Sequence, residues 1–301
     1  MVNLLLYAGT VLIWGTTWLP IKMQLGVVPV EVSVAYRFLI ASVLLFAFCA
    51  VRGLPMRFRA RDHLFIAALG LCFFSTNYLL IYNGSAYLTS GLVAIVFSTI
   101  VVMNIANAGL FFGRKPEARV IAGAVLGIVG LCVTFWPELA AFSLDRGGSL
   151  GLILCLAGTL SASFGSMASS RNSQAGVPVV QANAFGMGYG AVFMLIYAAA
   201  SGASFTYEPT LGYTFSLLYL ALFGSVFGFG CYLSLVGRIG PERAGYATVL
   251  FPIIALGLST VFEGYQWSLR EGVAVALILA GNTLILAKPA PKTPAAKPGR
   301  A

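Results

Sequence analysis

The sequence predicts an all-α protein that crosses a lipid bilayer ten times. Hydrophobic residues make up 59% of its 301 residues and charged residues only 9%, and the mean hydropathy is +0.92. A soluble domain is about half apolar and a quarter charged, so no water-soluble core accounts for this balance. Asp, Glu, Lys and Arg are also missing from the long stretches 1–21, 64–113, 172–207 and 209–237. Because lipid offers no partner to unpaired backbone groups, we expect these stretches to be helices.

The length of each apolar stretch sets the number of helices, since a bilayer core of roughly 30 Å needs about 20 apolar residues per span. Cutting the chain at its charges and at clusters of Gly, Pro, Asn and Ser gives ten spans. They lie at residues 3–24, 31–51, 64–83, 89–113, 118–137, 149–170, 179–201, 211–237, 243–264 and 270–287.

Three of these elements need separate justification. Span one has no basic leader and continues past Trp14 without a small-residue cleavage site, so it is a span and not a signal peptide. Spans three and four share the charge-free stretch 64–113, which is too long for one crossing. The polar run 82–85 separates them.

The basic residues predict the orientation, because Lys and Arg near the spans are retained on the cytoplasmic side. Fourteen of the 18 follow spans two, four, six, eight and ten, so we expect both termini to be cytoplasmic. The net charge of +9 is spread over these short loops, which argues against a nucleic-acid partner and for the lipid bilayer. Residues 288–301, rich in Pro, Ala and Lys, are expected to form a disordered cytoplasmic tail.

The two halves of the chain resemble each other weakly. Gly9-Thr10 recurs as Gly158-Thr159, and Pro29 recurs as Pro178. We therefore expect one five-helix repeat at 1–140 and a second at 147–287. Five is odd, so equivalent helices point in opposite directions, and the alternation of the basic loops agrees. Such an inverted repeat gives two related conformations around a site near the bilayer midplane.

Short motifs carry a resemblance to a known family: the segment Trp14-Gly15-Thr16-Thr17-Trp18, the pair Arg37-Phe38, the pair Phe251-Pro252, Glu263, and the glycines of spans five and ten. With the ten-span layout, residues 1–287 resemble the drug/metabolite transporter superfamily with two EamA-type repeats. Within it the chain looks most like the aromatic amino-acid exporters of the YddG type. The resemblance implies a bacterial inner-membrane protein with a central cavity, lined by spans one, three, four, six, eight and nine, and with five and ten peripheral. The position matching Pro252 is Ser98, so we expect no equivalent proline kink in span four.

Polar and aromatic side chains within apolar spans are the candidates for binding a solute. Aromatic rings suit a planar apolar group, and amides and hydroxyls suit a zwitterion. The alternative roles are an interfacial belt, to which we assign Trp18, Tyr87, Tyr207 and Tyr213, and helix packing. The candidate substrate-binding residues are Trp14, Thr17, Asn77, Tyr78, Tyr82, Ser98, Ser163, Asn183, Tyr232, Tyr246 and Thr248.

Three further residues are assigned to structure or gating. Arg37 lies inside span two, where a charge is costly. It could attract a substrate carboxylate, or it could reach the interface or pair with Glu31 or Glu263, and the structural role is the preferred interpretation. Gly228 and Pro252 are expected to soften spans that bend between states.

The sequence also lacks the residues that other chemistries need. The five cysteines are isolated in apolar segments without metal-ligand spacing, so we expect no metal and no cofactor. The single histidine, His63, cannot assemble a catalytic set, no carboxylate lies mid-span, and there is no phosphate loop, so we expect no enzyme. The sequence predicts a monomeric carrier that exports small metabolites, most simply aromatic amino acids, downhill by alternating access. The alternatives are a proton-coupled exporter of other metabolites or drugs, and a non-transporting scaffold or receptor.

Overall fold

The computed structural model describes residues 1–17, 20–21, 23–24, 26–263 and 267–287, without the side chains of 255, 258–259 and 261–263. Within these ranges every regular element is helical, which confirms the all-α class. The chain makes ten helical passes there. The single-helix passes are α1 (Val2–Gly15), α3 (Val30–Val51), α8 (Ala118–Thr134), α10 (Arg146–Gln174), α11 (Val179–Ala200), α15 (Ala247–Glu263) and α16 (Leu269–Leu286).

The three remaining passes are composite. The third joins α4 (Ala60–Leu71), η1 (Cys72–Thr76) and α5 (Asn77–Ser85), the fourth joins α6 (Ser90–Ser98) and α7 (Ile100–Phe112), and the eighth joins α12 (Leu211–Tyr219), η2 (Leu220–Phe227) and α13 (Gly228–Ile239). Short helices α9 (Trp136–Ala140) and α14 (Pro241–Ala244) lie in connections. Of the described passes, seven are long and apolar enough to cross a membrane by length and composition. The predicted tail at 288–301 lies outside the described residues.

The first helix ends earlier than the predicted boundary at residue 24. The Thr16 and Thr17 hydroxyls donate to the carbonyls of Ile13 and Trp14, at 2.8 and 2.7 Å. These bonds satisfy carbonyls that the last turn leaves open, and they end the helix at Gly15. Hydropathy alone does not detect such local competition for the backbone.

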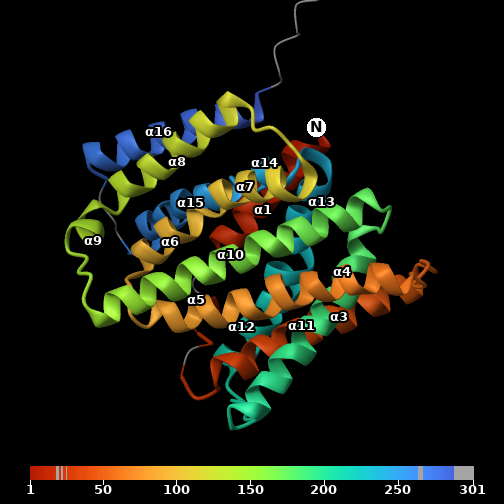
Figure 1. The fold of residues 1–301 in the computed structure, drawn as a ribbon. Coiled ribbons are helices and arrows are strands. Elements are labelled where there is room, and N and C mark those ends of the chain that lie inside the picture. The colour runs from red at the N-terminus through yellow and green to blue at the C-terminus, as the bar shows by residue number, and fades with distance from the viewer. Residues whose placement is uncertain (18–19, 22, 25, 264–266, 288–301) are drawn as a thin grey trace, which may run out of the picture.

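The packing of the helices is reciprocal between the two halves (Figure 1). Helix α1, the first helix of the first repeat, lies against α13 and α15 of the eighth and ninth passes. Its counterpart in the second repeat, α10, lies against the third and fourth passes. The second and seventh passes, α3 and α11, run along each other, as do the fifth and tenth, α8 and α16. Exchanging the halves leaves this pattern unchanged. The fold is therefore two interlocked, inverted five-helix repeats.

The third and eighth passes, which are counterparts, each contain a π-helical segment, η1 and η2. In both cases a side chain from the first helix of the other repeat donates to a carbonyl of the segment. Ser161 Oγ on α10 donates to Cys72 O, and Trp14 Nε1 on α1 donates to Gly224 O, each at 2.9 Å. Single π turns inside α-helices often mark functional sites.

The fourth pass is interrupted although it has no proline. Helices α6 and α7 meet at Thr99, where the hydroxyls of Ser98 and Thr99 donate to the carbonyls of Ile95 and Val96, both at 2.6 Å. Such back-bonding from hydroxyl side chains bends helices. The absence of a proline kink therefore did not imply a straight helix, whereas α15 continues through Pro252 as one helix.

Glycines allow α8 and α16 to pack closely at one edge of the bundle (Figure 1). An ideal Cβ on Gly123 would lie 2.7 Å from the Gly281 carbonyl oxygen, and one on Gly130 would lie 2.9 Å from the Ala274 carbonyl oxygen. Small residues permit this approach where lipid gives no hydrophobic drive for association. The fifth and tenth helices are thus peripheral, as the resemblance implies.

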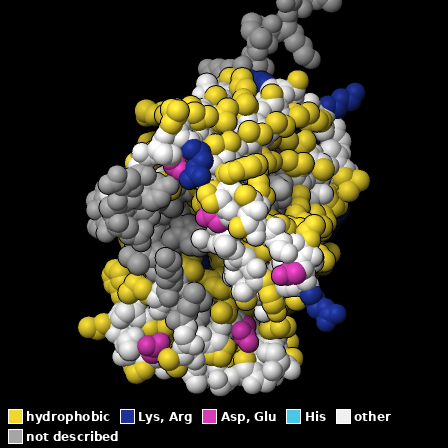
Figure 2. Space-filling model, turned by 90° about the vertical axis from the view of Figure 1, so that its left-hand side faces the viewer, with side chains coloured by type: hydrophobic (Ala, Val, Ile, Leu, Met, Phe, Trp, Pro, Cys, Tyr) yellow, Lys and Arg dark blue, Asp and Glu magenta, His cyan; other side chains and the backbone are white. Residues whose placement is uncertain are grey.

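The outer surface of the bundle is apolar. Leu4, Leu110 and Leu211 are 66%, 76% and 91% exposed. Figure 2 shows hydrophobic side chains over much of the described part of one face, with only a few scattered charges. An apolar surface of this extent is unfavourable in water and fits hydrocarbon, so the molecule is an integral membrane protein.

Candidate functional site

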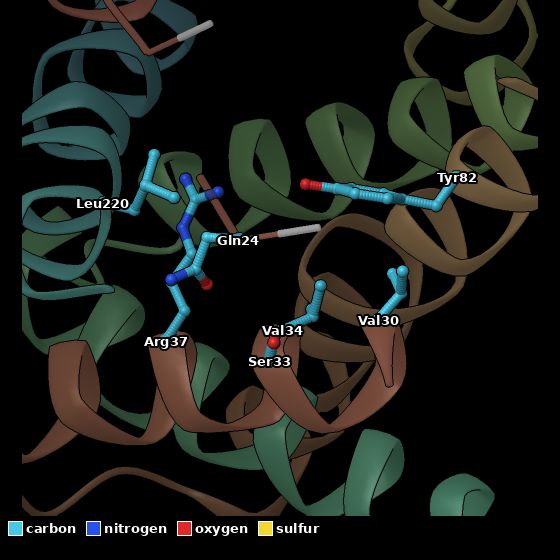
Figure 3. Close-up of a pocket in the computed structure, with 7 residues that line it drawn as sticks. All are labelled: Gln24, Val30, Ser33, Val34, Arg37, Tyr82 and Leu220. Atoms are coloured by element: carbon cyan, nitrogen blue, oxygen red, sulfur yellow. The ribbon is translucent and has the colours of Figure 1, made fainter. Parts of the chain in front are cut away.

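A narrow pocket lies between the second, third and eighth passes (Figure 3). Its cavity volume is about 10 Å³, roughly the room that one water molecule needs. In this structure the pocket is too small to hold a solute. It is lined by Gln24, Val30, Ser33, Val34, Arg37, Tyr82 and Leu220.

The second pass, which is not among the helices that the resemblance implied for the central cavity, supplies most of this lining. Val30, Ser33, Val34 and Arg37 all lie on α3, whereas the fourth, sixth and ninth passes contribute no lining residue to this pocket. In the predicted orientation the lining residues lie in the extracytoplasmic halves of their helices. Both repeats take part, because Leu220 belongs to the second.

Arg37 is the charged residue of the pocket and is only 4% exposed. Its Nε donates to Ser225 Oγ at 2.8 Å. The guanidinium carbon lies 5.2 Å from the ring centre of Tyr78 and 5.3 Å from that of Phe38, within cation–π range. Among the described side chains no carboxylate forms an ion pair with it, Glu31 included. The side chain of Glu263, the other suggested partner, lies outside the described set.

The π-helical segment η2 positions Arg37. Ser225 Oγ donates to the Leu220 carbonyl, five residues earlier, at 3.0 Å, and accepts the Arg37 Nε hydrogen. An ideal Cβ on Gly224 would lie 3.0 Å from Arg37 Nη2, so glycine leaves the room that the guanidinium occupies. Within η2, the Ser225 hydroxyl thus binds the guanidinium, and Gly224 leaves the space that it needs.

Tyr78 and Tyr82 form an aromatic wall next to Arg37. They lie one turn apart on α5 and their rings stack with centres 6.3 Å apart, while Phe38 packs edge-on against Tyr78 at 5.1 Å. Figure 3 shows Tyr82 and Arg37 reaching the pocket from opposite sides, with the Tyr82 hydroxyl pointing inward. The structure thus brings together Tyr78, Tyr82 and Arg37, three residues that the sequence analysis selected.

Trp14 and Tyr232 lie in an aromatic cluster deeper in the bundle. The Trp14 ring centre is 4.8 Å from that of Phe229, 5.1 Å from that of Tyr232 and 5.4 Å from that of Phe251. Tyr232 is fully buried, with its hydroxyl 3.3 Å from Ser166 Oγ. These rings pack beside η2 and do not line the pocket.

Gly228 and Thr17 belong to the surroundings of the same cluster. An ideal Cβ on Gly228 would lie 2.4 Å from Trp14 Nε1, so this glycine is required for close packing. Thr17 is buried, and its methyl carbon would lie 3.4 Å from a Cβ on Gly224. Both residues support the π segment that carries Ser225.

Ser163 lies in a polar cluster between the fourth and sixth passes. Its hydroxyl donates to Asn104 Oδ1 at 2.7 Å and accepts from Asn107 Nδ2 at 2.8 Å, and Asn104 Nδ2 donates to the Pro241 carbonyl at 2.8 Å. The cluster ties both repeats together near the cytoplasmic end of the predicted topology. It is a buried network whose polar groups satisfy one another.

The other predicted residues are dispersed. Tyr246 is fully buried, donates to the Ile278 carbonyl at 2.9 Å and packs against Gly127 and Gly281, so it points between the fifth and tenth passes. Ser98 donates to the Ile95 carbonyl within α6, and Thr248 donates to the Gly245 carbonyl just before α15. Asn77 and Asn183 are buried, and their Oδ1 atoms find no partner among the described residues. Pro252 is buried within α15.

Ion pairs join the two repeats at the opposite end from the pocket. Arg114 faces Glu242 at 3.5 Å, Glu117 pairs with Arg243, and Asp62 lies 2.8 Å from Arg171. We call these three pairs the clamp. Because Asp62 begins the third pass and Arg171 ends the sixth, their contact places these ends on one side, as the inverted arrangement requires.

The clamp carboxyl Glu117 is held in its charged form. A hydrogen bond from Arg119 at 2.6 Å, together with the nearby charge of Arg243, lowers the pKa of Glu117 below its usual value of 4.5. Glu117 lies in the connection before α8, where its side chain is 42% exposed. The clamp is therefore intact at neutral pH and reaches solvent.

Gln24 and Ser33 are pocket residues that sequence reasoning missed. Gln24 Nε2 donates to the Ser216 hydroxyl at 2.9 Å, and Ser33 Oγ lies 2.9 Å from the Tyr213 hydroxyl. A signal for Ser33 was present, because it precedes Arg37 by four residues and shares its helix face. Tyr213, assigned to the interfacial belt, is instead only 1% exposed.

As far as the chain is described, no three His, Cys, Asp or Glu side chains gather into a metal site.

Two interlocked inverted repeats around a polar pocket define a membrane transporter fold. The chain belongs to the EamA-like transporter family, which matches residues 1–136 and 149–287. It is a membrane transporter of this family within the drug/metabolite transporter superfamily.

Similar proteins agree with this placement. The chain is 30% identical to the uncharacterized inner membrane transporter YedA of Escherichia coli K12, covering 92% of this chain and 90% of YedA. It is 25% identical to protein PagO of Salmonella typhimurium, with 91% and 90% covered. A solved crystal structure superposes with a TM-score of 0.76 at 18% identity, covering 94% of this chain and 96% of the other, which is a likeness of fold.

Proposed function

We propose that this transporter exports aromatic amino acids across the bacterial inner membrane, with both termini in the cytoplasm. The observation that carries the proposal is the pocket where Tyr82, backed by Tyr78, faces Arg37. An aromatic wall offers stacking to a planar ring, and stacked or edge-on pairs contribute about 0.5–1.5 kcal/mol each. Gln24 and Ser33 add polar side chains to the lining.

The transport cycle is proposed to be alternating access. The pocket lies at the extracytoplasmic end of the predicted topology, and the clamp closes the opposite end. Opening one end while closing the other carries a solute through without a continuous pore, which inverted repeats achieve by exchanging conformations. No described carboxylate lines the pocket, so the simplest energetics is downhill exchange.

The test is counterflow in proteoliposomes containing the purified full chain. Labelled tryptophan and phenylalanine should enter vesicles preloaded with unlabelled substrate, with or without a pH gradient. Tyr82→Ala should weaken apparent affinity about 2- to 10-fold, the size of one lost aromatic contact. The matched control is Tyr87→Ala, because Tyr87 is 50% exposed and lies outside the pocket.

Three outcomes would overturn parts of this proposal. If neither amino acid exchanges while another metabolite does, the substrate is wrong. A strict requirement for the pH gradient would replace downhill exchange by proton coupling. Absence of any flux across a broad panel of solutes would favour a scaffold or receptor.

A further inference from the structure

We infer that Arg37 recognises an anionic group of the transported solute, so that the carrier is selective for carboxylates. The inference rests on the proposed function and names the group of the substrate that Arg37 binds. It revises the structural role that the sequence suggested for Arg37.

The burial of Arg37 is the first step of the argument. Arg37 as a residue is only 4% exposed, so its charge has lost most of its water, and a buried charge without an ionic partner is strongly unfavourable. The described contacts of Arg37 are hydrogen bonds to two neutral hydroxyls, those of Ser225 and Tyr78, and two aromatic faces. Neither kind of contact neutralises the charge, so the site retains affinity for an anion.

The direction of the side chain is the second step. Ser225 takes the Nε hydrogen, and Figure 3 shows the terminal nitrogens of Arg37 beside the pocket that Gln24 and Tyr82 also line. The terminal N–H groups form a planar fork that matches a carboxylate with two parallel hydrogen bonds. In a wider form of the pocket, a carboxylate would lie between the fork and the ring of Tyr82.

The way Arg37 is held is the third step. Ser225 is fixed by the Leu220 carbonyl in the π turn of η2, and Gly224 leaves space for Nη2. A side chain that only needed to reach water would not require a π turn, a hydroxyl and a glycine to hold it inside the bundle. The arrangement preorganises the fork, which lowers the entropic cost of binding.

The test compares a carboxylate with its own amide. In detergent, tryptophan should raise the unfolding midpoint of the full chain and bind at least about tenfold more tightly than tryptophanamide, the size of one charge-assisted hydrogen bond. Arg37→Gln should lower tryptophan affinity by about the same factor and leave the amide nearly unchanged. Arg37→Lys should retain part of the preference, because it keeps the charge without the fork.

Two controls separate this role from a structural one. Glu263→Gln should leave the preference for tryptophan over tryptophanamide intact, because in this proposal the carboxylate of the solute, and not Glu263, pairs with Arg37. An equal loss of this preference in Glu263→Gln and in Arg37→Gln would overturn the inference. If Arg37→Gln does not fold, the preference of the unaltered protein and the Arg37→Lys variant still decide. An unaltered protein that binds carboxylate and amide equally, or an Arg37→Gln variant that loses both equally, overturns the inference.

The same assay distinguishes this inference from the proposed substrate. Leucine and glutamate are tested with their amides alongside tryptophan. An Arg37-dependent carboxylate preference for one of these, without tryptophan binding, supports the inference and refutes the aromatic assignment. Tryptophan exchange without any Arg37-dependent preference does the reverse.

Discussion

Removing two of the three clamp carboxyls should open the end of the transporter that the clamp closes. The perturbation is the double variant Glu117→Gln/Glu242→Gln, which breaks the pairs with Arg243 and Arg114 and keeps side-chain size. These pairs are partly exposed, with side-chain exposures between 19% and 42%, so each contributes about 0.2–1 kcal/mol. Two pairs sum to about 0.4–2 kcal/mol, a roughly 2- to 30-fold shift between closed and open states.

The assay is the distance between spin labels on the two repeats in lipid nanodiscs. Lys115→Cys and Arg238→Cys place labels on exposed side chains that are not part of the clamp, in a background without the five native cysteines. The double variant should increase the population of long distances by that factor. Exchanging the charges of one pair, Glu117→Arg/Arg243→Glu, in place of Glu117→Gln should restore that pair and recover the short distance. An unchanged distance distribution in the double variant would refute the reasoning.

Three further predictions follow from individual contacts. The pKa of Glu117 is lowered first by Arg119 on the same segment and further by Arg243 across the clamp, and opening removes only the contribution of Arg243. That contribution stabilises the closed state above a pH of about 4.5 and is lost as pH falls through the lowered pKa, so long distances should grow in acid. Gly228→Ala should lower stability by about 1–3 kcal/mol in thermal unfolding, because the new Cβ collides with Trp14. Ser163→Ala should cost about 1–3 kcal/mol, because it strands the buried amides of Asn104 and Asn107.

Each of these has a matched control. The acid response should disappear in Glu117→Gln/Glu242→Gln, and persistence there would assign it to another group. Gly230→Ala meets no atom within 4 Å and should leave the unfolding midpoint unchanged or higher, so an equal loss would refute the steric argument. Ser85→Ala removes an exposed hydroxyl, and a loss as large as that of Ser163→Ala would contradict the network.

Much of the architecture was fixed by local sequence properties. Apolar length and charge placement predicted ten helices and their inversion, because the bilayer imposes one length and one charge rule on every span. The early end of α1 and the break at Thr99 were not predicted, because both depend on hydroxyl back-bonds that compete with the helix. Family resemblance placed the fifth and tenth helices at the periphery.

The site could be predicted only in part. Tyr78 and Tyr82 were chosen as polar aromatics one turn apart, and the structure places them next to Arg37. Nothing in the sequence indicated that η2 would hold Ser225 against Arg37, since that contact joins residues 188 positions apart. Tyr246, like Tyr82, is a tyrosine within an apolar span, yet it packs between α8 and α16 and not at the pocket.

The sequence by itself determined that this chain spans a membrane as two opposed repeats, because hydrophobicity and charge act through the bilayer, span by span. Only the tertiary structure decided which polar side chains share a pocket and whether a buried charge finds a partner. Those properties depend on the rotation of each helix about its axis and on π turns that change this rotation midway. Packing between helices sets both, and no single helix encodes it.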